Sequence, residues 1–228
     1  MPMASVEQQE SWAEDVEATL AWCRQHTNNF DTLGEYEILF RYAAGWTCRP
    51  RSESILEIGA YEGQSDVVLV RALQARCLRL GLPAERLVAV DPCEGLVAAG
   101  LVDTKFGSQG WTTFAQWHKF LLEHDAYGQV VPVVATTAQA LPLLRRLRVR
   151  MMFIDGDHFN PGLRVDTDLA DEVVVPGGVV LFHDCRERRD DSPTGWYYDV
   201  EPEVQRLLDT GGWRWVEKVD HMAVLERV

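Results

Sequence analysis

The feature that most constrains the fold of this 228-residue chain is a regular alternation of short apolar runs with helix-forming segments after residue 54. Short runs rich in Val, Ile, Leu and Met, separated by helices, are typical of parallel strands that are buried on both faces. The pattern predicts an α/β fold with a Rossmann-like, doubly wound and mostly parallel sheet. The expected strands are residues 54–59, 86–92, 130–135, 150–156 and 178–184, and the helices between them are residues 64–80, 111–124, 137–147 and 161–174.

The end of the chain has a different pattern. After a helix expected at residues 201–209, two apolar runs at 213–219 and 222–227 are separated only by Asp220 and His221. A separation of two residues is typical of a β-hairpin. We therefore expect a seven-stranded sheet that ends in an antiparallel pair.

The residues before the first strand predict two helices. Ser5 with Gln8 has the spacing of a capping box, and apolar residues at near-helical spacing follow it in an expected helix over residues 5–26. Thr32 with Glu35 has the same spacing and begins a shorter expected helix that runs through Ala44. These helices either cover the substrate opening or pack on the sheet edge. We expect an N-terminal helical cap region at residues 1–50, and a core at 51–228, within one domain.

Composition excludes several classes of partner. The net charge is −13, from 22 basic and 35 acidic residues, without a basic stripe. This argues against nucleic acid and anionic membranes as partners. No apolar run approaches the ~20 residues of a membrane span, and no signal-peptide pattern is visible, so a cytoplasmic location is expected. The five cysteines are widely spaced without CxxC, which favours reduced thiols.

The segment ILEIGAYEGQS, residues 55–65, predicts a strand, a glycine-bearing turn and a helix N-terminus, where nucleotide-type cofactors bind. Gly59 and Gly63 do not form the GxGxxG of dinucleotide enzymes, and Tyr61 stands where a close-approach glycine is needed. Glu57 would repel a pyrophosphate but suits a cofactor carrying a sulfonium and an ammonium group. A tight turn without function is the alternative.

The next strand ends in Asp91, within VAVDP. An acid there can accept both hydroxyls of a ribose, or it can cap the turn before Pro92. Its position after the glycine turn favours a ribose-bearing cofactor.

Acids and imidazoles follow two later strands. FIDGDH carries Asp155, Asp157 and His158, and LFHDC carries His183 and Asp184. If the two strands are neighbours, Asp155 and Asp184 converge, and a divalent cation would keep both ionised. The alternative is that the acids cap the following helices, which applies to Asp157 above all.

These motifs, together with PGGVVLFHD, resemble the class I S-adenosylmethionine-dependent methyltransferases over residues 55–228. The resemblance is closer to the O-methyltransferases of the macrocin and mycinamicin sugar type, which are related to the caffeoyl-CoA type. It implies that Asp155 and Asp184 hold magnesium and that His158 takes the proton. The cofactor-binding residues implied are Glu57, Gly59, Ala60, Tyr61, Gly63, Ser65, Asp91, Thr136 and Asp155.

Methyl transfer gives the cluster a purpose. A free alcohol is protonated near neutral pH, and a metal that holds the substrate oxygens lowers the hydroxyl pKa, with His158 as the base. The relatives carry Glu before the second Asp or Asn after it, whereas this chain has His183 and Cys185 there. A His183 ligand shifts preference from magnesium towards manganese, iron or zinc. Metal identity stays open, and His158 could also act without a metal.

Aromatic residues and a glycine-rich segment complete the candidates. Trp196, Tyr197 and Tyr198 are expected to line a pocket for a sugar or an aromatic ring. The segment at residues 94–110 is either a lid or a surface loop. The tryptophans expected to pack in the core or on the sheet are Trp111, Trp117, Trp213 and Trp215.

The sequence thus predicts an S-adenosylmethionine-dependent O-methyltransferase that acts on a hydroxyl of a small sugar-bearing or phenolic natural product, as in antibiotic biosynthesis. The alternatives are an NAD-linked oxidoreductase and a non-catalytic binding protein on the same fold. The apolar N-terminal helices could supply a homo-oligomer interface.

Overall fold

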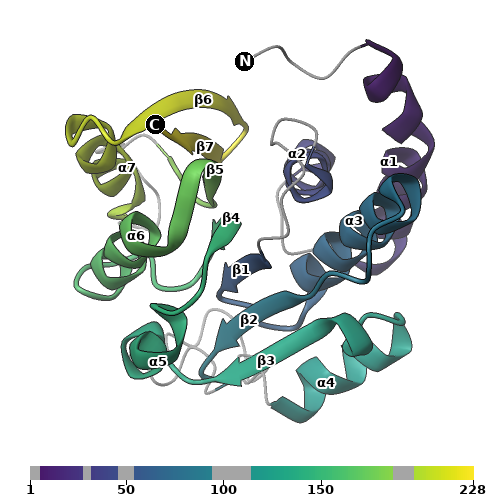
Figure 1. Ribbon diagram of the computed structural model, residues 1–228. Coiled ribbons are helices and arrows are strands. Elements are labelled where there is room, and N and C mark those ends of the chain that lie inside the picture. The colour runs from purple at the N-terminus through teal and green to yellow at the C-terminus, as the bar shows by residue number, and fades with distance from the viewer. Residues whose placement is uncertain (1–5, 28–31, 46–53, 94–113, 187–197) are drawn as a thin grey trace.

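A computed structural model describes residues 6–27, 32–45, 54–93, 114–186 and 198–228. The strands are β1 (Ser54–Ile58), β2 (Leu87–Asp91), β3 (Val130–Val134), β4 (Val149–Ile154), β5 (Val174–Phe182), β6 (Trp213–Val219) and β7 (Met222–Arg227). They form one sheet in the order β3-β2-β1-β4-β5-β7-β6 (Figure 1). Strands β1 to β5 are parallel, and β7 pairs antiparallel with both β5 and β6. The predicted doubly wound sheet with a C-terminal hairpin is confirmed.

Helices cover both faces of this sheet. They are α1 (Val6–His26), α2 (Leu33–Ala44), α3 (Gln64–Leu80), α4 (Phe114–Glu123), α5 (Thr137–Leu144), α6 (Gly162–Val173) and α7 (Val200–Asp209), with a short 3-10 helix at Tyr127–Gln129. Helices α1 to α4 lie on one side and α5 to α7 on the other (Figure 1). In β4, Phe153 packs into the first layer and its neighbour Ile154 into the second. Burial on both faces explains why these strands are mostly apolar, with Glu57 of β1 and Arg150 of β4 as buried exceptions.

The N-terminal helices share the core of the first layer. Trp12, Leu20 and Cys23 of α1 are buried with apolar side chains of α2 and α3. Helix α2 begins with the predicted capping box of Thr32 and Glu35. Among the described helices, none combines the length and the apolar character that crossing a membrane requires.

Two details differ from expectation. Strand β5 begins at Val174, where the end of a helix was expected, and its pairing with β4 shifts register between Val149 and Met151. Trp213 packs in the core as predicted, but Trp215 is 46% exposed on the edge strand, so the prediction for Trp215 is wrong. Trp117 is fully buried as predicted, and Trp111 lies outside the described residues.

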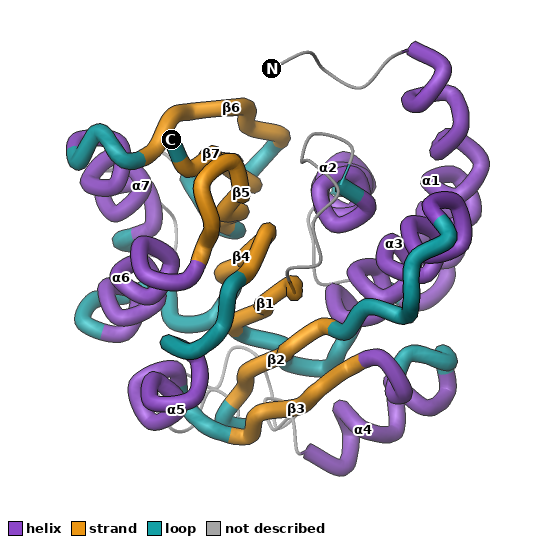
Figure 2. The backbone as a smooth tube through the Cα atoms, in the orientation of Figure 1, coloured by secondary structure: helices purple, strands orange, loops and turns teal. Residues whose placement is uncertain are grey.

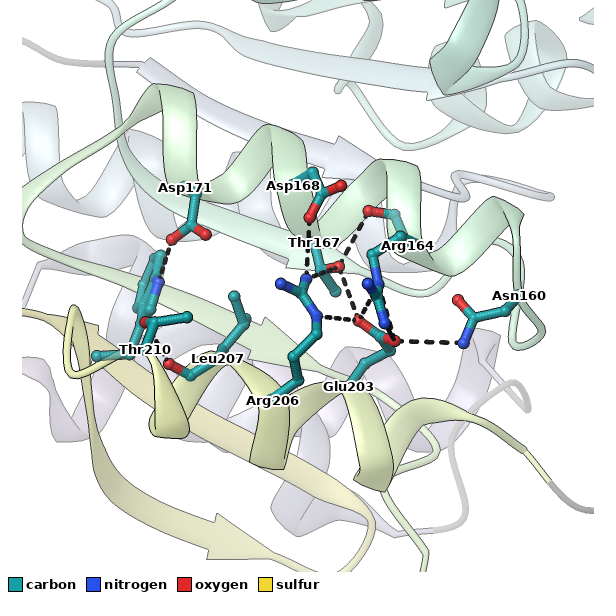
Figure 3. A network of polar contacts seen from close by, with 10 residues as sticks. Asn160, Arg164, Thr167, Asp168, Asp171, Glu203, Arg206, Leu207 and Thr210 are labelled. Atoms are coloured by element: carbon teal, nitrogen blue, oxygen red, sulfur yellow. Dashed lines mark hydrogen bonds and ion pairs between the residues drawn. The ribbon is translucent and has the colours of Figure 1, made fainter.

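An ion-pair network around the buried Glu203 carboxylate joins α6 to α7 (Figure 3). The Glu203 carboxylate accepts hydrogen bonds from Arg164 Nη2 and Arg206 Nε, both at 2.7 Å. These hydrogen bonds outweigh burial and lower the Glu203 pKa to about 2. Just before α7, the Asp199 N–H donates to the His158 carbonyl at 2.9 Å. The network therefore holds the start of α7 beside the loop that carries His158.

Candidate active site

The acids and histidines predicted to converge do so at the carboxyl ends of β4 and β5, which are neighbours in the sheet (Figure 2). Ile154 is paired with Phe182, and the His183 N–H continues the ladder by donating to the Ile154 carbonyl at 3.1 Å. The residues that follow each strand therefore lie side by side. Open α/β sheets place their ligands at this edge.

Four side chains form a compact cluster there. Asp155 Oδ1 lies 3.0 Å from His183 Nδ1, and Asp184 Oδ2 lies 3.1 Å from His158 Nε2. One potential ligand atom from each of these four residues lies within 4.8 Å of the others. The Arg186 guanidinium closes one side, with Nη2 2.8 Å from Asp184 Oδ1. The arrangement has the donor chemistry and the size of a divalent-cation site.

Two neighbouring candidates lie outside this cluster. Asp157 Oδ1 accepts the Phe159 N–H at 3.0 Å, which is the local capping role that the alternative interpretation expected. Cys185 is buried in the apolar core of the second layer, and burial raises the pKa of its thiol to about 11. Cys185 is therefore a core residue in this structure, whereas His183 belongs to the cluster.

The negative charges of Asp155 and Asp184 are balanced by protons on the two imidazoles and by the Arg186 guanidinium. Burial opposes charge on both imidazoles, but the nearby carboxylates outweigh it and raise the pKa of His158 to about 9 and that of His183 to about 11. Burial would raise the pKa of Asp155, yet the imidazoles lower it to about 2. A cation that binds His183 must displace its proton, because only a neutral imidazole is a ligand.

A third carboxylate that sequence reasoning missed approaches from α2. Glu35 is fully buried, and its Oε1 lies 3.8 Å from His183 Nε2. The same oxygen accepts the His221 N–H at 3.0 Å, while Oε2 accepts the Thr32 N–H at 3.3 Å. The capping-box spacing identified Glu35 as a helix-start residue, but carried no signal of its contact with residue 183.

The glycine turn after β1 packs directly against the cluster. Gly59 has φ +91°, and a Cβ added there would lie 2.2 Å from the Asp155 carbonyl oxygen. Gly63, with φ +87°, is the N-cap of α3, and an added Cβ would lie 2.8 Å from the Trp117 ring. Both positions require glycine because the conformation and the close approach exclude a side chain. Ala60, between them, is buried.

Asp91 is tied to this turn. Its Oδ2 accepts the Tyr61 N–H at 2.9 Å, and its Oδ1 accepts the Cys93 N–H at 2.6 Å. Each carboxylate oxygen has a second lone pair, so these bonds leave Asp91 able to accept further hydroxyls. The glycine turn and the acid at the end of the next strand, which the sequence placed one after the other, are therefore in direct contact.

Glu57 is fully buried beneath the turn, facing Asp66 of α3. Within the described residues, neither Glu57 oxygen makes a well-formed hydrogen bond, although Ser65 and Asp66 are near enough to influence its pKa. Burial and repulsion from Asp66 raise the pKa of Glu57 well above its ordinary value. Trp117 Nε1 donates to Asp66 Oδ2 at 2.7 Å. Asp66, which the sequence analysis did not single out, completes a buried acidic pair.

The remaining predicted residues are more scattered. Thr136 caps α5, where its Oγ1 accepts the Gln139 N–H at 3.3 Å. The Tyr198 ring lies 4.7 Å from the His158 ring, centroid to centroid. Trp196, Tyr197 and the segment at residues 94–110 lie outside the described residues.

Solved structures share this fold. The O-methyltransferase TomG from Streptomyces achromogenes, involved in tomaymycin synthesis and solved with SAM, is 20% identical, with 99% of this chain and 96% of that chain covered and a TM-score of 0.56. The O-methyltransferase NovP is 14% identical, with coverages of 89% and 83% and a TM-score of 0.64. An O-methyltransferase from Bacillus cereus, solved with SAH, is 13% identical, with coverages of 99% and 98% and a TM-score of 0.58.

The family comparison is more specific. A model of the methyltransferase domain matches residues 56–185, more than half of the chain and the whole stretch from the glycine turn to the second acid of the cluster. This match removes the reason to retain an NAD-linked oxidoreductase. The chain belongs to this methyltransferase family, and it has the fold of the solved O-methyltransferases.

Proposed function

We propose that the chain is an S-adenosylmethionine-dependent O-methyltransferase that methylates a hydroxyl group of a small natural product, sugar-bearing or phenolic, with the assistance of a divalent cation. The observation that carries the proposal is the convergence of Asp155, His183 and Asp184 beside His158 at the ends of two paired strands. The structural neighbours TomG and NovP, both O-methyltransferases, support transfer to an oxygen atom, and the part of TomG in tomaymycin synthesis supports a natural product as acceptor.

The cofactor would lie over the glycine turn. Its sulfonium supplies the methyl group. The buried Glu57 carboxylate, without a well-formed hydrogen bond of its own, suits the ammonium of the methionine end, with Gly59, Gly63 and Ser65 around it. Asp91 would accept the ribose hydroxyls, Thr136 would lie beside the adenine, and Ala60, Tyr61 and Asp155 would complete the site.

The cation would be held by Asp155, His183 and Asp184. When bound, it lowers the pKa of an acceptor hydroxyl and orients it. The two carboxylates suit magnesium, and the imidazole broadens the choice to manganese and other transition metals.

His158 would then take the proton of the acceptor hydroxyl. Its Nε2 points at Asp184 and Asp155, which hold the ring in place, and it serves as a base only in its neutral form. The Tyr198 ring beside it would pack against the ring of the acceptor.

The test is conversion of S-adenosylmethionine to S-adenosylhomocysteine with a panel of catechols and vicinal-diol glycosides. EDTA should abolish turnover, and added magnesium or manganese should restore it. Asp184→Asn should reduce turnover at least roughly 100-fold with S-adenosylhomocysteine affinity retained, whereas the capping variant Asp157→Asn should stay active. Unchanged turnover both after chelation and in Asp184→Asn would overturn the metal-assisted proposal.

A further inference from the structure

The Glu35 carboxylate joins the cluster from α2, far from the other members in sequence. It is fully buried, and its oxygens accept the backbone N–H groups of Thr32 and His221 at 3.3 and 3.0 Å. Two backbone donors fix the carboxylate in place, and the residue that it faces across the remaining space is His183. Such a placement is more than a helix cap requires.

The two ring nitrogens of His183 face different partners. Nδ1 lies 3.0 Å from Asp155 Oδ1 and 3.7 Å from Asp184 Oδ2, whereas Nε2 lies 3.8 Å from Glu35 Oε1. A histidine that ligates a metal through one nitrogen usually donates its other N–H to a carboxylate, which fixes the tautomer and strengthens the ligand. His183 has the matching orientation, with Nδ1 towards the candidate site and Nε2 towards Glu35, and the 3.8 Å between Nε2 and Oε1 must shorten for a hydrogen bond to form.

We infer that Glu35 is a positioning residue for a metal centre: by accepting the Nε2–H of His183, it presents the Nδ1 lone pair to a cation shared with Asp155 and Asp184. This inference rests on the proposed metal-assisted function. Glu35 itself is not a ligand, because the imidazole lies between it and the two acids.

The surroundings of Glu35 connect three segments. The His221 N–H donates to Glu35, and the His221 carbonyl accepts the Cys185 N–H at 2.8 Å. Thr32 Oγ1 also donates to the Asp220 carboxylate. The start of α2, the β6–β7 turn and the segment after β5 therefore form one frame, so the N-terminal helices contribute to the geometry of the site.

The experiment measures Mn²⁺ affinity of the full chain by the loss of the free-ion EPR signal, which requires no acceptor and no turnover. Glu35→Gln keeps the shape and removes the charge. Glu37→Gln makes the same change at the other acid of α2, which is partly exposed. Glu35→Gln should weaken Mn²⁺ binding roughly 10–100-fold, as outer-shell partners do, with Glu37→Gln unchanged.

A double-mutant cycle separates this role from a general one. In a His183→Gln background, Glu35→Gln should cause no further loss of Mn²⁺ affinity, because its effect passes through the imidazole. An equal loss in both backgrounds, or none in either, would overturn the inference. Failure of the wild-type chain to bind Mn²⁺ would instead overturn the proposed metal centre. Circular dichroism establishes that each variant is folded. If Glu35→Gln does not fold, Glu35→Asp, whose carboxylate is withdrawn by one methylene, takes its place in the same cycle.

Discussion

His158 Nε2 lies 3.1 Å from Asp184 Oδ2, so an imidazole that follows β4 is a hydrogen-bond partner of an acid that follows β5. The register of two parallel strands brings these side chains together, and the ion-pair network around Glu203 holds the loop of His158 against α7. These acids raise the pKa of His158 to about 9, so the imidazole can receive a proton from a hydroxyl bound at the same edge only after it has lost its own.

Substitution of His158 tests that role. His158→Gln should lower the rate of methyl transfer by roughly 10²–10⁴, the usual contribution of a general base, while S-adenosylhomocysteine affinity is retained. Single-turnover kinetics beside a binding titration measures the two effects separately. His118→Gln, a histidine of α4, is the matched control. A variant with an altered KM and an unchanged transfer rate would show that His158 binds the acceptor and does not catalyse.

Glu57 should affect stability and cofactor binding in opposite directions. Its raised pKa means that the ionised group destabilises the cofactor-free fold at pH values above its ordinary pKa. Glu57→Gln should therefore raise the free energy of unfolding by about 1–2 kcal/mol. It should also weaken S-adenosylmethionine binding roughly tenfold or more, a loss of about 1.4 kcal/mol. Glu62→Gln in the same turn should change neither, and tighter cofactor binding in Glu57→Gln would contradict the assignment.

Two glycine substitutions test how closely the turn after β1 approaches the end of β4. Gly59→Ala would place a Cβ 2.2 Å from the Asp155 carbonyl oxygen, whereas Gly81→Ala, with φ +62°, meets nothing within 4 Å. Gly81→Ala should cost about 1–2 kcal/mol of unfolding free energy for the left-handed backbone alone. Gly59→Ala should cost clearly more and should also reduce cofactor affinity. Equal costs in urea unfolding would mean that the turn has room to move away from β4.

The Glu203 network predicts a pH-dependent contribution to stability. Its pKa falls from 4.5 to about 2 on folding, so the ionised carboxylate stabilises fully above pH 4.5, and the contribution is lost as pH falls towards 2. Near neutral pH, Glu203→Gln should lower the free energy of unfolding by roughly 3 kcal/mol, because the buried carboxylate loses its charge beside two partly exposed arginines.

Urea unfolding over a pH series checks this, because the difference between wild type and Glu203→Gln should narrow at acid pH. Asp168→Asn removes a 57% exposed partner of Arg206 and should have little effect at any pH. A difference that stays constant down to pH 2 would show that packing, and not charge, is lost.

The layered fold was predictable because each element carries its own signal. Strands buried on both faces are mostly apolar, and the helices between them lie close to the ranges expected from the sequence. Convergence of Asp155 and Asp184 followed from the rule that consecutive parallel strands tend to be neighbours. These inferences need only local pattern and one topological rule.

The contacts of Glu35 and Asp66 were not predictable, because they depend on how α2 and α3 dock on the sheet. Glu35 has a sufficient local explanation as a capping residue, and Asp66 is a single acid in the first turn of α3. Trp215 was misassigned because alternation places it on the same face as Trp213, whereas the edge position and a register shift after Trp215 leave it exposed. The early start of β5 was not predictable, because Pro and Gly residues interrupt its apolar run and its pairing with β4 shifts register there.

The most direct test of the metal-centre proposal is an anomalous difference map from crystals grown with S-adenosylhomocysteine and Mn²⁺. The account predicts one strong peak between Asp155, Asp184 and Nδ1 of His183, beside the bound cofactor product. Bound S-adenosylhomocysteine without a peak there, or with the peak at other residues, would contradict it.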